Sequence, residues 1–296
     1  MKTNSRPETY GVINSSGYAS APVTKTPAWH GLVAWDMLLN GMTTGLFLVA
    51  AISELTVPDV FTFGAKAAYP VALVLLLLDL LLLVLDLGDP LRFHHMLRVF
   101  KPSAPMSLGT WCLTIYSLPL TVAAAISLWP EESMALEWVR RLAIVIGFLP
   151  ALGSAVYKGV LLSTNSQPGW KDARWLGGYL TNSAFMLGCA EMLVISVLMS
   201  NANAVTILRP ALSLLLALNL LPLCLLGFDL RTTLSRIYSR QEVYGVTVLS
   251  LGSLLVPLSL LLVSGSAPSM LIAVTLVFLG SLFIRFVIVA LPHASE

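Results

Sequence analysis

The sequence predicts an all-α integral membrane protein whose eight transmembrane helices form two four-helix bundles. Of the 296 residues, 57% are hydrophobic and only 11% are charged, whereas about 25% of the residues of an ordinary soluble protein are charged. The mean hydropathy is +0.84. The apolar residues form continuous runs of about 20, the length of a helix that crosses about 30 Å of hydrocarbon. Membrane β-barrels instead alternate apolar and polar residues in segments of about ten, so the spans are expected to be helices.

Eight apolar runs predict the spans in order, and the polar segments between them predict loops. The spans are expected near residues 29–54, 67–87, 107–129, 139–162, 176–199, 207–228, 244–264 and 269–291. Residues 1–28 are polar, rich in Ser, Thr and Pro, and lack the apolar core of a signal peptide. We expect them to form an extramembrane tail, with residues 29–291 as the membrane domain and 292–296 as a C-terminal tail.

The ends of the second and sixth spans resemble one another. The segment LDLGDPLR at residues 85–92 is weakly similar to LGFDLR at residues 226–231, and an arginine-bearing loop follows each. Many membrane proteins are built from internal repeats. This similarity therefore favours an internal duplication of a four-helix unit, with halves at residues 29–162 and 176–291.

Basic residues are distributed unequally between the two sides of the predicted domain. Eight crossings place both termini on one side, here called the N-side, with the loops after the second, fourth and sixth spans. The N-side holds twelve of the 17 Lys and Arg residues, and the other side holds Lys66, Arg140, Arg141 and Arg209. The positive-inside rule then predicts a multi-pass protein of the cell (inner) membrane with a cytoplasmic N-side.

Composition also excludes several functions. The net charge of +2 gives no basic field for nucleic acid. Cys112, Cys189 and Cys224 lie in apolar runs without metal-ligand spacing, so we expect neither a metal site nor an iron–sulfur cluster in this chain. The four histidines, His30, His94, His95 and His293, lie at span ends or in loops. They cannot supply the paired axial ligands of a b haem within the spans.

Polar side chains inside the spans indicate where function lies, because each costs about 2.5 to 3.5 kcal/mol to insert. They are Asp36, Asn40, Asp79, Asp86, Tyr157, Lys158, Asn182, Glu191, Asn219, Asp229 and Arg285. Counted from the helix ends, most lie in the N-side half, and the opposite half holds little beyond Glu54 and Asn219. This asymmetry favours a one-sided pocket over a transport site at the midplane, which needs access from both faces.

Simpler interpretations exist for several of these residues. Asp86, Lys158 and Asp229 are also explained as helix-end residues in the headgroup zone. Asn182 and Asn219 are also explained as interhelical hydrogen bonds. Arg285 is different, because a buried guanidinium keeps its charge and needs a carboxylate partner or an anionic ligand oxygen.

Two stretches carry a family resemblance. DLGDPLRF at residues 86–93, followed by SAPMSLGTW at 103–111, resembles the D-L-G-R-P-x-R-F and S-P-M-S-x-G-x-W signature of the NrfD-like, polysulfide reductase membrane-subunit family. YKGVLLS at 157–163 resembles the Y-T-G-x-L-L-S of that family. Further matches are Gly41, Gly45, Trp170, residues 182–184 and residues 285–286. The sequence departs from the family pattern at four positions. Asp89 replaces an arginine, Lys158 replaces a small polar residue, Asn40 stands where the family often has an apolar or small residue, and Asp79 is additional.

The resemblance implies an eight-helix subunit that binds menaquinone or ubiquinone and docks an iron–sulfur subunit of the four-cluster type. That partner often serves a molybdopterin catalytic subunit, so this chain would be the membrane subunit of an oxidoreductase and not catalytic alone. The resemblance also places the quinone site or its proton path at His30 or Asp36, Asp86, Tyr157 and Arg285.

Quinol oxidation releases two electrons and two protons, and this chemistry assigns roles to the residues. His30, Asn40 and Tyr157 are predicted to bind the ring. Asp36 and Asp86 are the predicted proton acceptors, and Arg285 is predicted to hold a carboxylate or an anionic ring oxygen. A proton path is predicted through Asp79, Glu191 and Asp229, and partner docking at Arg92, Arg98 and Lys101.

Two other functions stay open at this point, an ion or solute transporter and a purely structural anchor. The side of the membrane that carries the partner is open as well, because the resemblance implies the exported face and the charge distribution predicts the cytoplasm.

Overall fold

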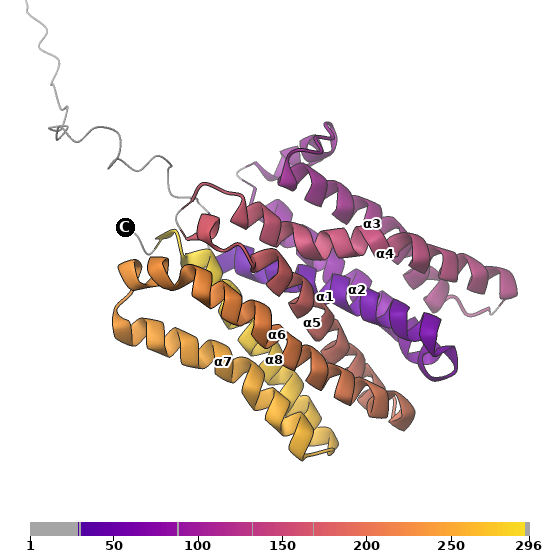
Figure 1. Ribbon diagram of the computed structural model, residues 1–296. Helices are drawn as coiled ribbons and strands as arrows, with labels where there is room; N and C mark the ends of the chain where they lie inside the picture. Colours follow the sequence, from indigo (N-terminus) through magenta and orange to yellow (C-terminus); the bar gives the residue numbers. More distant parts are fainter. Residues whose placement is uncertain (1–28, 30, 88, 132, 168, 294–296) are drawn as a thin grey trace, which may run out of the picture.

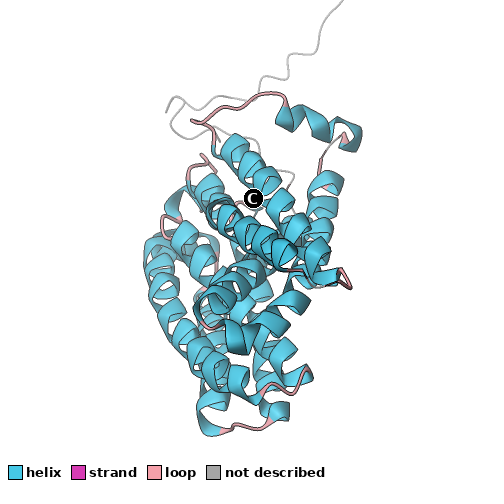
Figure 2. Ribbon diagram, turned by 90° about the vertical axis from the view of Figure 1, so that its right-hand side faces the viewer, coloured by secondary structure: helices cyan, strands magenta, loops and turns pink. Residues whose placement is uncertain are grey.

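A computed structural model describes residues 29, 31–87, 89–131, 133–167 and 169–293, and these residues form helices and short connections with no strand (Figures 1 and 2). Eight of the helices are long and apolar enough to cross a membrane. They are α1 (Gly31–Thr56), α2 (Pro58–Leu85), α3 (Pro105–Leu128), α4 (Met134–Ser163), α5 (Leu176–Leu198), α6 (Ala202–Ile237), α7 (Arg240–Val263) and α8 (Ala267–Ala290). The all-α membrane fold class is confirmed.

Several helices are longer than the apolar runs that predicted them, and α2 and α6 differ most. α2 begins at Pro58, whose missing N–H and fixed φ suit the first turn of a helix, and not near residue 67. α6 continues beyond residue 228 to Ile237 and ends where Tyr238 adopts an extended conformation. Hydropathy detects only the part of a helix that lies in hydrocarbon, so it misses polar turns at the ends. Arg231, which was expected in the loop after the sixth span, therefore lies on a helix.

The helices pack as two groups of four. In the first group α1 contacts α2, α2 contacts α3, α3 contacts α4, and α4 contacts α1. In the second group α5, α6, α7 and α8 contact one another in the same cyclic order. α1 and α5 join the groups and are the most buried of the eight helices.

Backbone contact joins the two central helices. A Cβ on Gly45 of α1 would overlap the carbonyl of Ala184 on α5, and a Cβ on Gly188 of α5 would overlap the backbone of Gly45. Small residues let transmembrane helices approach this closely, and the gain is van der Waals packing. The crossing fixes how the first group sits against the second.

The N-side is one end of the molecule, where α1, α3, α5 and α7 begin and α2, α4, α6 and α8 end (Figure 1). Two short 3-10 helices lie in the loops there, η2 (Pro90–Leu97) after α2 and η3 (Trp170–Asp172) after α4. η3 is anchored by Trp170, whose fully buried indole donates to the Ile288 carbonyl of α8 at 2.7 Å.

Candidate functional site

A cavity of about 130 Å³ lies at the N-side end of the first group, between α1, α2, α3 and α4. Most of its walls are apolar, with Val33, Met37, Leu83, Leu161 and others facing inward. The ionisable groups in the walls come from three different elements. They are Asp36 of α1, Asp86 at the end of α2, and Tyr157 and Lys158 of α4.

A buried ionic cluster forms the inner wall of this cavity. The Lys158 ammonium lies 2.9 Å from Asp36 Oδ2 and 3.1 Å from Asp79 Oδ1, and it also donates to the Asp36 carbonyl at 3.0 Å. The side chains of Lys158, Asp36 and Asp79 are at most 9% exposed. Lys158 is therefore not a helix-end residue in the headgroup zone, which corrects the simpler interpretation of its sequence position.

A second layer of polar groups holds the cluster in place. The Asn40 amide donates to Asp79 Oδ2 at 3.3 Å and to Ser154 Oγ at 3.0 Å. Asn40 follows Asp36 by one turn of α1, and Ser154 precedes Lys158 by one turn of α4, so each pair shares a helix face. Asn40 thus lies behind the cavity wall and not in it. Ser154 was not predicted, although its spacing from Lys158 was a usable signal.

One acceptor of the cluster is left over. Asp36 Oδ1 is buried and has no hydrogen-bond partner among the described residues, whereas Asp36 Oδ2 pairs with Lys158. An unsatisfied carboxylate oxygen is costly in an apolar environment. In a residue that lines a cavity, such an atom is suited to accept a hydrogen bond from a bound molecule.

Tyr157 reaches the cavity because a glycine faces it. A Cβ on Gly109 of α3 would overlap the Tyr157 ring, so the SLGTW segment leaves space for this side chain. The Lys158 ammonium lies 5.7 Å from the centroid of the same ring. Asp86 occupies the C-cap position of α2 and is half-buried.

Arg285 lies elsewhere. It is fully buried between α8, α5 and α1, where it donates to the Ser281 carbonyl at 3.0 Å and to Ser183 Oγ at 3.2 Å. A Cβ on Gly41 of α1 would lie 3.0 Å from Arg285 Nη2, so the glycine leaves room for the guanidinium. Arg285 has no carboxylate partner among the described residues and does not line the cavity. Arg285 therefore does not line the cavity that Tyr157 and Asp86 share, and its role in a quinone site stays a prediction.

The remaining predicted residues are dispersed. His30 lies outside the described residues. Glu191 of α5 is buried, Asp229 of α6 is half-buried, and each has one carboxylate oxygen without a hydrogen-bond partner in the described part of the chain. Neither lines the cavity, and the proton path through them and Asp79 stays a prediction. Asn182 donates to the Leu215 carbonyl of α6 at 3.3 Å, as expected of an interhelical hydrogen bond.

The opposite half of the membrane domain is more polar than the sequence indicated. Arg140 of α4 is fully buried and reaches both carboxylate oxygens of Glu54, at 2.8 and 2.6 Å. Tyr69 of α2 donates to Glu54 at 2.7 Å, and Glu137 contacts Arg140 at 2.6 Å. Arg140 was expected at the membrane surface opposite the N-side, because the fourth span was expected to begin at residue 139, whereas α4 begins at Met134 and places Arg140 well inside the helix. The sequence signal that was missed is Glu54 itself, because a glutamate buried in a span needs a basic partner.

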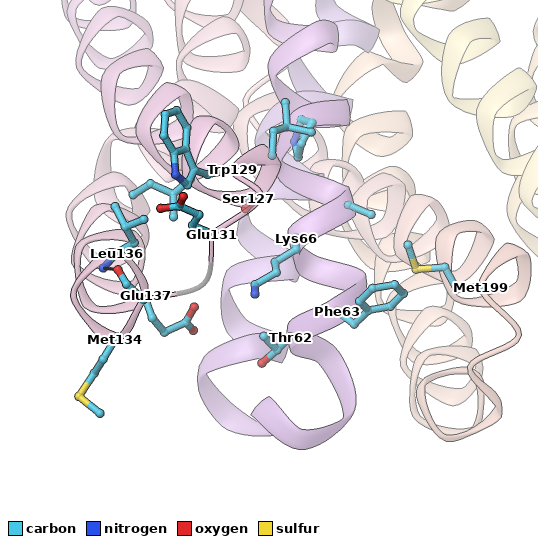
Figure 3. A pocket seen from close by; sticks show the side chains of 15 residues that line it. Thr62, Phe63, Lys66, Ser127, Trp129, Glu131, Met134, Leu136, Glu137 and Met199 are labelled. Carbon is cyan, nitrogen blue, oxygen red and sulfur yellow. Dashed lines mark hydrogen bonds between the residues drawn. The ribbon is translucent and has the colours of Figure 1, made fainter.

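A larger cavity of about 760 Å³ opens beside this second cluster. Figure 3 shows Lys66 of α2 across from Glu131 and Glu137, which lie before and within the first turn of α4. Aromatic packing separates the two clusters, because Phe47 of α1 lies between Tyr69 and Tyr116 with ring centroids 5.9 and 5.2 Å away. Among the described residues, none of the hydrogen bonds or ion pairs of this cluster reaches Asp36, Asp79, Asn40 or Lys158.

The predicted docking residues lie on the loop between α2 and α3. Arg92, Arg98 and Lys101 are all exposed, and Arg92 pairs with Asp89 at 2.9 Å. Large apolar side chains are exposed beside them. Leu91 is 84% exposed and Phe100 is 56% exposed. A polar rim around exposed apolar side chains is typical of an interaction surface.

Comparison with known proteins gives one result. The family model described as "Polysulphide reductase, NrfD" matches residues 21–292, which is nearly the whole chain. No curated protein sequence matches the chain.

Proposed function

The chain belongs to the NrfD family of membrane subunits of quinone-linked oxidoreductases, and we propose that its N-side cavity binds the ring of a quinol or quinone that exchanges electrons with a docked iron–sulfur subunit. Quinol supplies two electrons and two protons when it is oxidised there. The partner of this family is typically an iron–sulfur subunit that serves a molybdenum subunit.

One observation carries the proposal. Carboxylate, phenol and ammonium groups converge on a single apolar-walled cavity, and Asp36 Oδ1 there lacks a hydrogen-bond partner among the described residues. A quinol hydroxyl needs an acceptor that can also take its proton. Asp36 meets both requirements, and Asp86 offers a second carboxylate on the side toward the N-side surface.

The size of the cavity fits a ring and not a whole isoprenoid quinone. Its volume of about 130 Å³ is below the roughly 300–1,000 Å³ of pockets for drug-sized ligands. Its apolar walls suit the ring faces, and the tail would extend between helices into the lipid.

The chain's own residues then have distinct roles. Lys158 and Asn40 hold Asp36 and Asp79 in fixed positions and offset their charge. The Tyr157 phenol hydrogen-bonds the ring, held in place by the close approach of Gly109. Protons leave through Asp36 and Asp86 toward the N-side. Arg285 is outside this machinery and contributes to the packing of α1, α5 and α8.

Substitutions in the cavity test the proposal. In the purified complex, Asp36→Asn is expected to slow reduction of the partner cluster by a soluble quinol at least 100-fold, since a general base contributes about 10²–10⁴-fold. Tyr157→Phe removes one hydrogen bond and is expected to slow it about tenfold. The rate is measured by stopped-flow absorbance of the cluster.

Asp59→Asn is the matched control, because Asp59 is an exposed carboxylate at the other end of α2. It should reduce the cluster at the wild-type rate. Normal turnover in Asp36→Asn and Tyr157→Phe, with the complex assembled, would show that the cavity is not the quinone site and that the chain is a structural anchor.

Docking is tested by charge reversal on the loop between α2 and α3. The triple variant Arg92→Glu, Arg98→Glu, Lys101→Glu is expected to lose copurification of the iron–sulfur subunit, because like charges then face the docking surface. Lys171→Glu with Arg174→Glu is the control on another exposed N-side segment. If the control loses the partner and the triple variant keeps it, the docking surface lies on the loop after α4.

A further inference from the structure

An apolar groove lies at the N-side end of the second group of helices, away from the quinone cavity. It has a volume of about 370 Å³ between α6, α7 and α8. Leu223 and Leu230 of α6, Leu251 of α7 and Ile288 of α8 are among the residues in its walls. In the described part of the chain these walls carry no carboxylate, imidazole or phenol. The groove therefore lacks the proton acceptors that a quinol site needs.

The length of the groove corresponds to one leaflet of a bilayer. Its wall on α6 extends from Leu223 to Leu234, and the part from Leu223 up to Arg231 is about 12 Å long at 1.5 Å per residue. Half of the roughly 30 Å hydrocarbon core is about 15 Å. A single acyl chain that runs parallel to the helices fits this depth.

The mouth of the groove is positively charged. Arg231 lies in its wall, and an adjoining cavity of about 510 Å³, which shares Val243 and Thr247 with it, has Arg240 in its wall. Both arginines are exposed, and neither forms an ion pair within the described residues. The Arg231 guanidinium stacks 4.0 Å from the centroid of the Phe228 ring, which holds it at the surface of the bundle. Tyr238 and Tyr244 also line the adjoining cavity.

We propose that this groove binds an anionic phospholipid, with one acyl chain between α6, α7 and α8 and the phosphate at Arg231 and Arg240. Apolar walls one leaflet deep select an acyl chain, and unpaired arginines at headgroup level select a negative phosphate. Tyr238 and Tyr244 occupy the interfacial position that aromatic residues favour. The site is separate from the quinone cavity and does not depend on the proposed function.

The experiment uses the purified full-length chain and two lipids with identical acyl chains, phosphatidylglycerol and phosphatidylcholine. Native mass spectrometry measures the apparent affinity of one retained lipid. The wild type is expected to prefer phosphatidylglycerol. Replacing Arg231 and Arg240 by Ala should weaken its binding roughly 25-fold, since each basic residue near the surface contributes roughly fivefold. Arg236→Ala is the matched control, because Arg236 is exposed on the same helix and lines neither cavity.

A second pair of variants tests the acyl-chain groove. Gly227 lines the groove, and a Cβ there would meet nothing within 4 Å. Gly227→Leu should therefore fill the groove without disturbing the fold and abolish retention of the lipid. Gly252 has equally open surroundings on α7 outside the groove, so Gly252→Leu should retain it.

Three results would overturn the proposal. Equal affinity for the two lipids would mean that the arginines do not read the headgroup. Unchanged retention in Gly227→Leu would place the lipid elsewhere on the surface. A copurified quinone that is lost in Gly227→Leu and kept in Asp36→Asn would assign the groove to a second quinone.

Discussion

Lys158 illustrates how a residue acquires a role only in the fold. The sequence showed a lysine where the family has a small polar residue, and its position near a span end allowed a headgroup location. In the structure its ammonium is shared by carboxylates from α1 and α2. The departures at Asn40, Asp79 and Lys158 thus belong together, because all three meet in one cluster. Sequence spacing along each helix was informative, but the pairing between helices was not contained in it.

Lys158→Met should destabilise the protein strongly. It leaves two buried carboxylates without a cation, and breaking a buried pair in this way costs about 3–5 kcal/mol. The double variant Lys158→Met, Asp79→Asn removes one of the two orphaned charges and should recover part of the loss. Thermal unfolding in detergent measures all variants, with Asp79→Asn completing the cycle. A double variant whose loss of stability equals the sum of the losses in Lys158→Met and Asp79→Asn would show that the two groups do not interact.

Arg285 and Arg140 differ from what was expected of them as buried cations. Arg285 attracted attention as an intramembrane cation, and its Nη1 and Nη2 donate to Ser281 and Ser183 within the packing of three helices, whereas its buried Nε has no partner among the described residues. Arg140 was expected at the surface at the start of the fourth span, yet it is buried and forms ion pairs with Glu54 and Glu137. An error of a few residues in a helix start was enough to hide it.

Among the elements, α1 and α5 could be predicted as spans but not as the centre of the molecule. Their mean hydropathy values, 1.4 for α1 and 1.5 for α5, are the lowest of the eight spans, because these two helices are buried by protein and not by lipid. The small residues Gly45 and Gly188 were visible in the sequence, and Gly45 was part of the family resemblance. Which helix each one faces depends on the tertiary packing, which periodicity alone does not give.

The crossing of α1 and α5 gives a prediction about glycine. Gly45→Ala places a methyl group against the Ala184 carbonyl, and overpacking of this kind typically costs about 1–3 kcal/mol. Gly245→Ala on α7 meets nothing within 4 Å and should be neutral or stabilising by up to about 1 kcal/mol, since Ala favours the helix over Gly. Melting temperatures in detergent distinguish the two. A Gly45→Ala protein as stable as Gly245→Ala would mean that the helices are not in backbone contact.

At the scale of the whole molecule, the two ends differ in chemistry. The N-side end carries the cavity with Asp36 and Tyr157 and the exposed loop between α2 and α3. The opposite end carries the Glu54 and Arg140 cluster. The larger cavity that Figure 3 shows lies beside it. Phe47 and its aromatic neighbours lie between them. A one-sided site for electron exchange fits this division better than a transport pathway, which needs polar access from both faces.

The orientation of these ends in the membrane follows from the basic residues. Lys158 and Arg140 are buried in ion pairs, so neither counts as a loop charge. The count of basic residues therefore falls by one on each side of the membrane domain. The excess of Lys and Arg on the N-side is thereby preserved. The positive-inside rule depends on loop charges near the span ends, and it predicts that the N-side and its docked partner face the cytoplasm.

Cysteine labelling checks this orientation. In a background where Cys112, Cys189 and Cys224 are replaced by Ser, single cysteines are introduced as His94→Cys on the N-side and Glu131→Cys on the opposite side, both at exposed positions. A membrane-impermeant maleimide is expected to label Glu131→Cys in intact spheroplasts and His94→Cys only after permeabilisation. The reverse pattern would place the loop between α2 and α3 on the exported face, as the family resemblance implies. In that case the arginines of this loop, including Arg92, lie on the side that the positive-inside rule disfavours for basic residues. Docking of the partner subunit is then the reason for their presence.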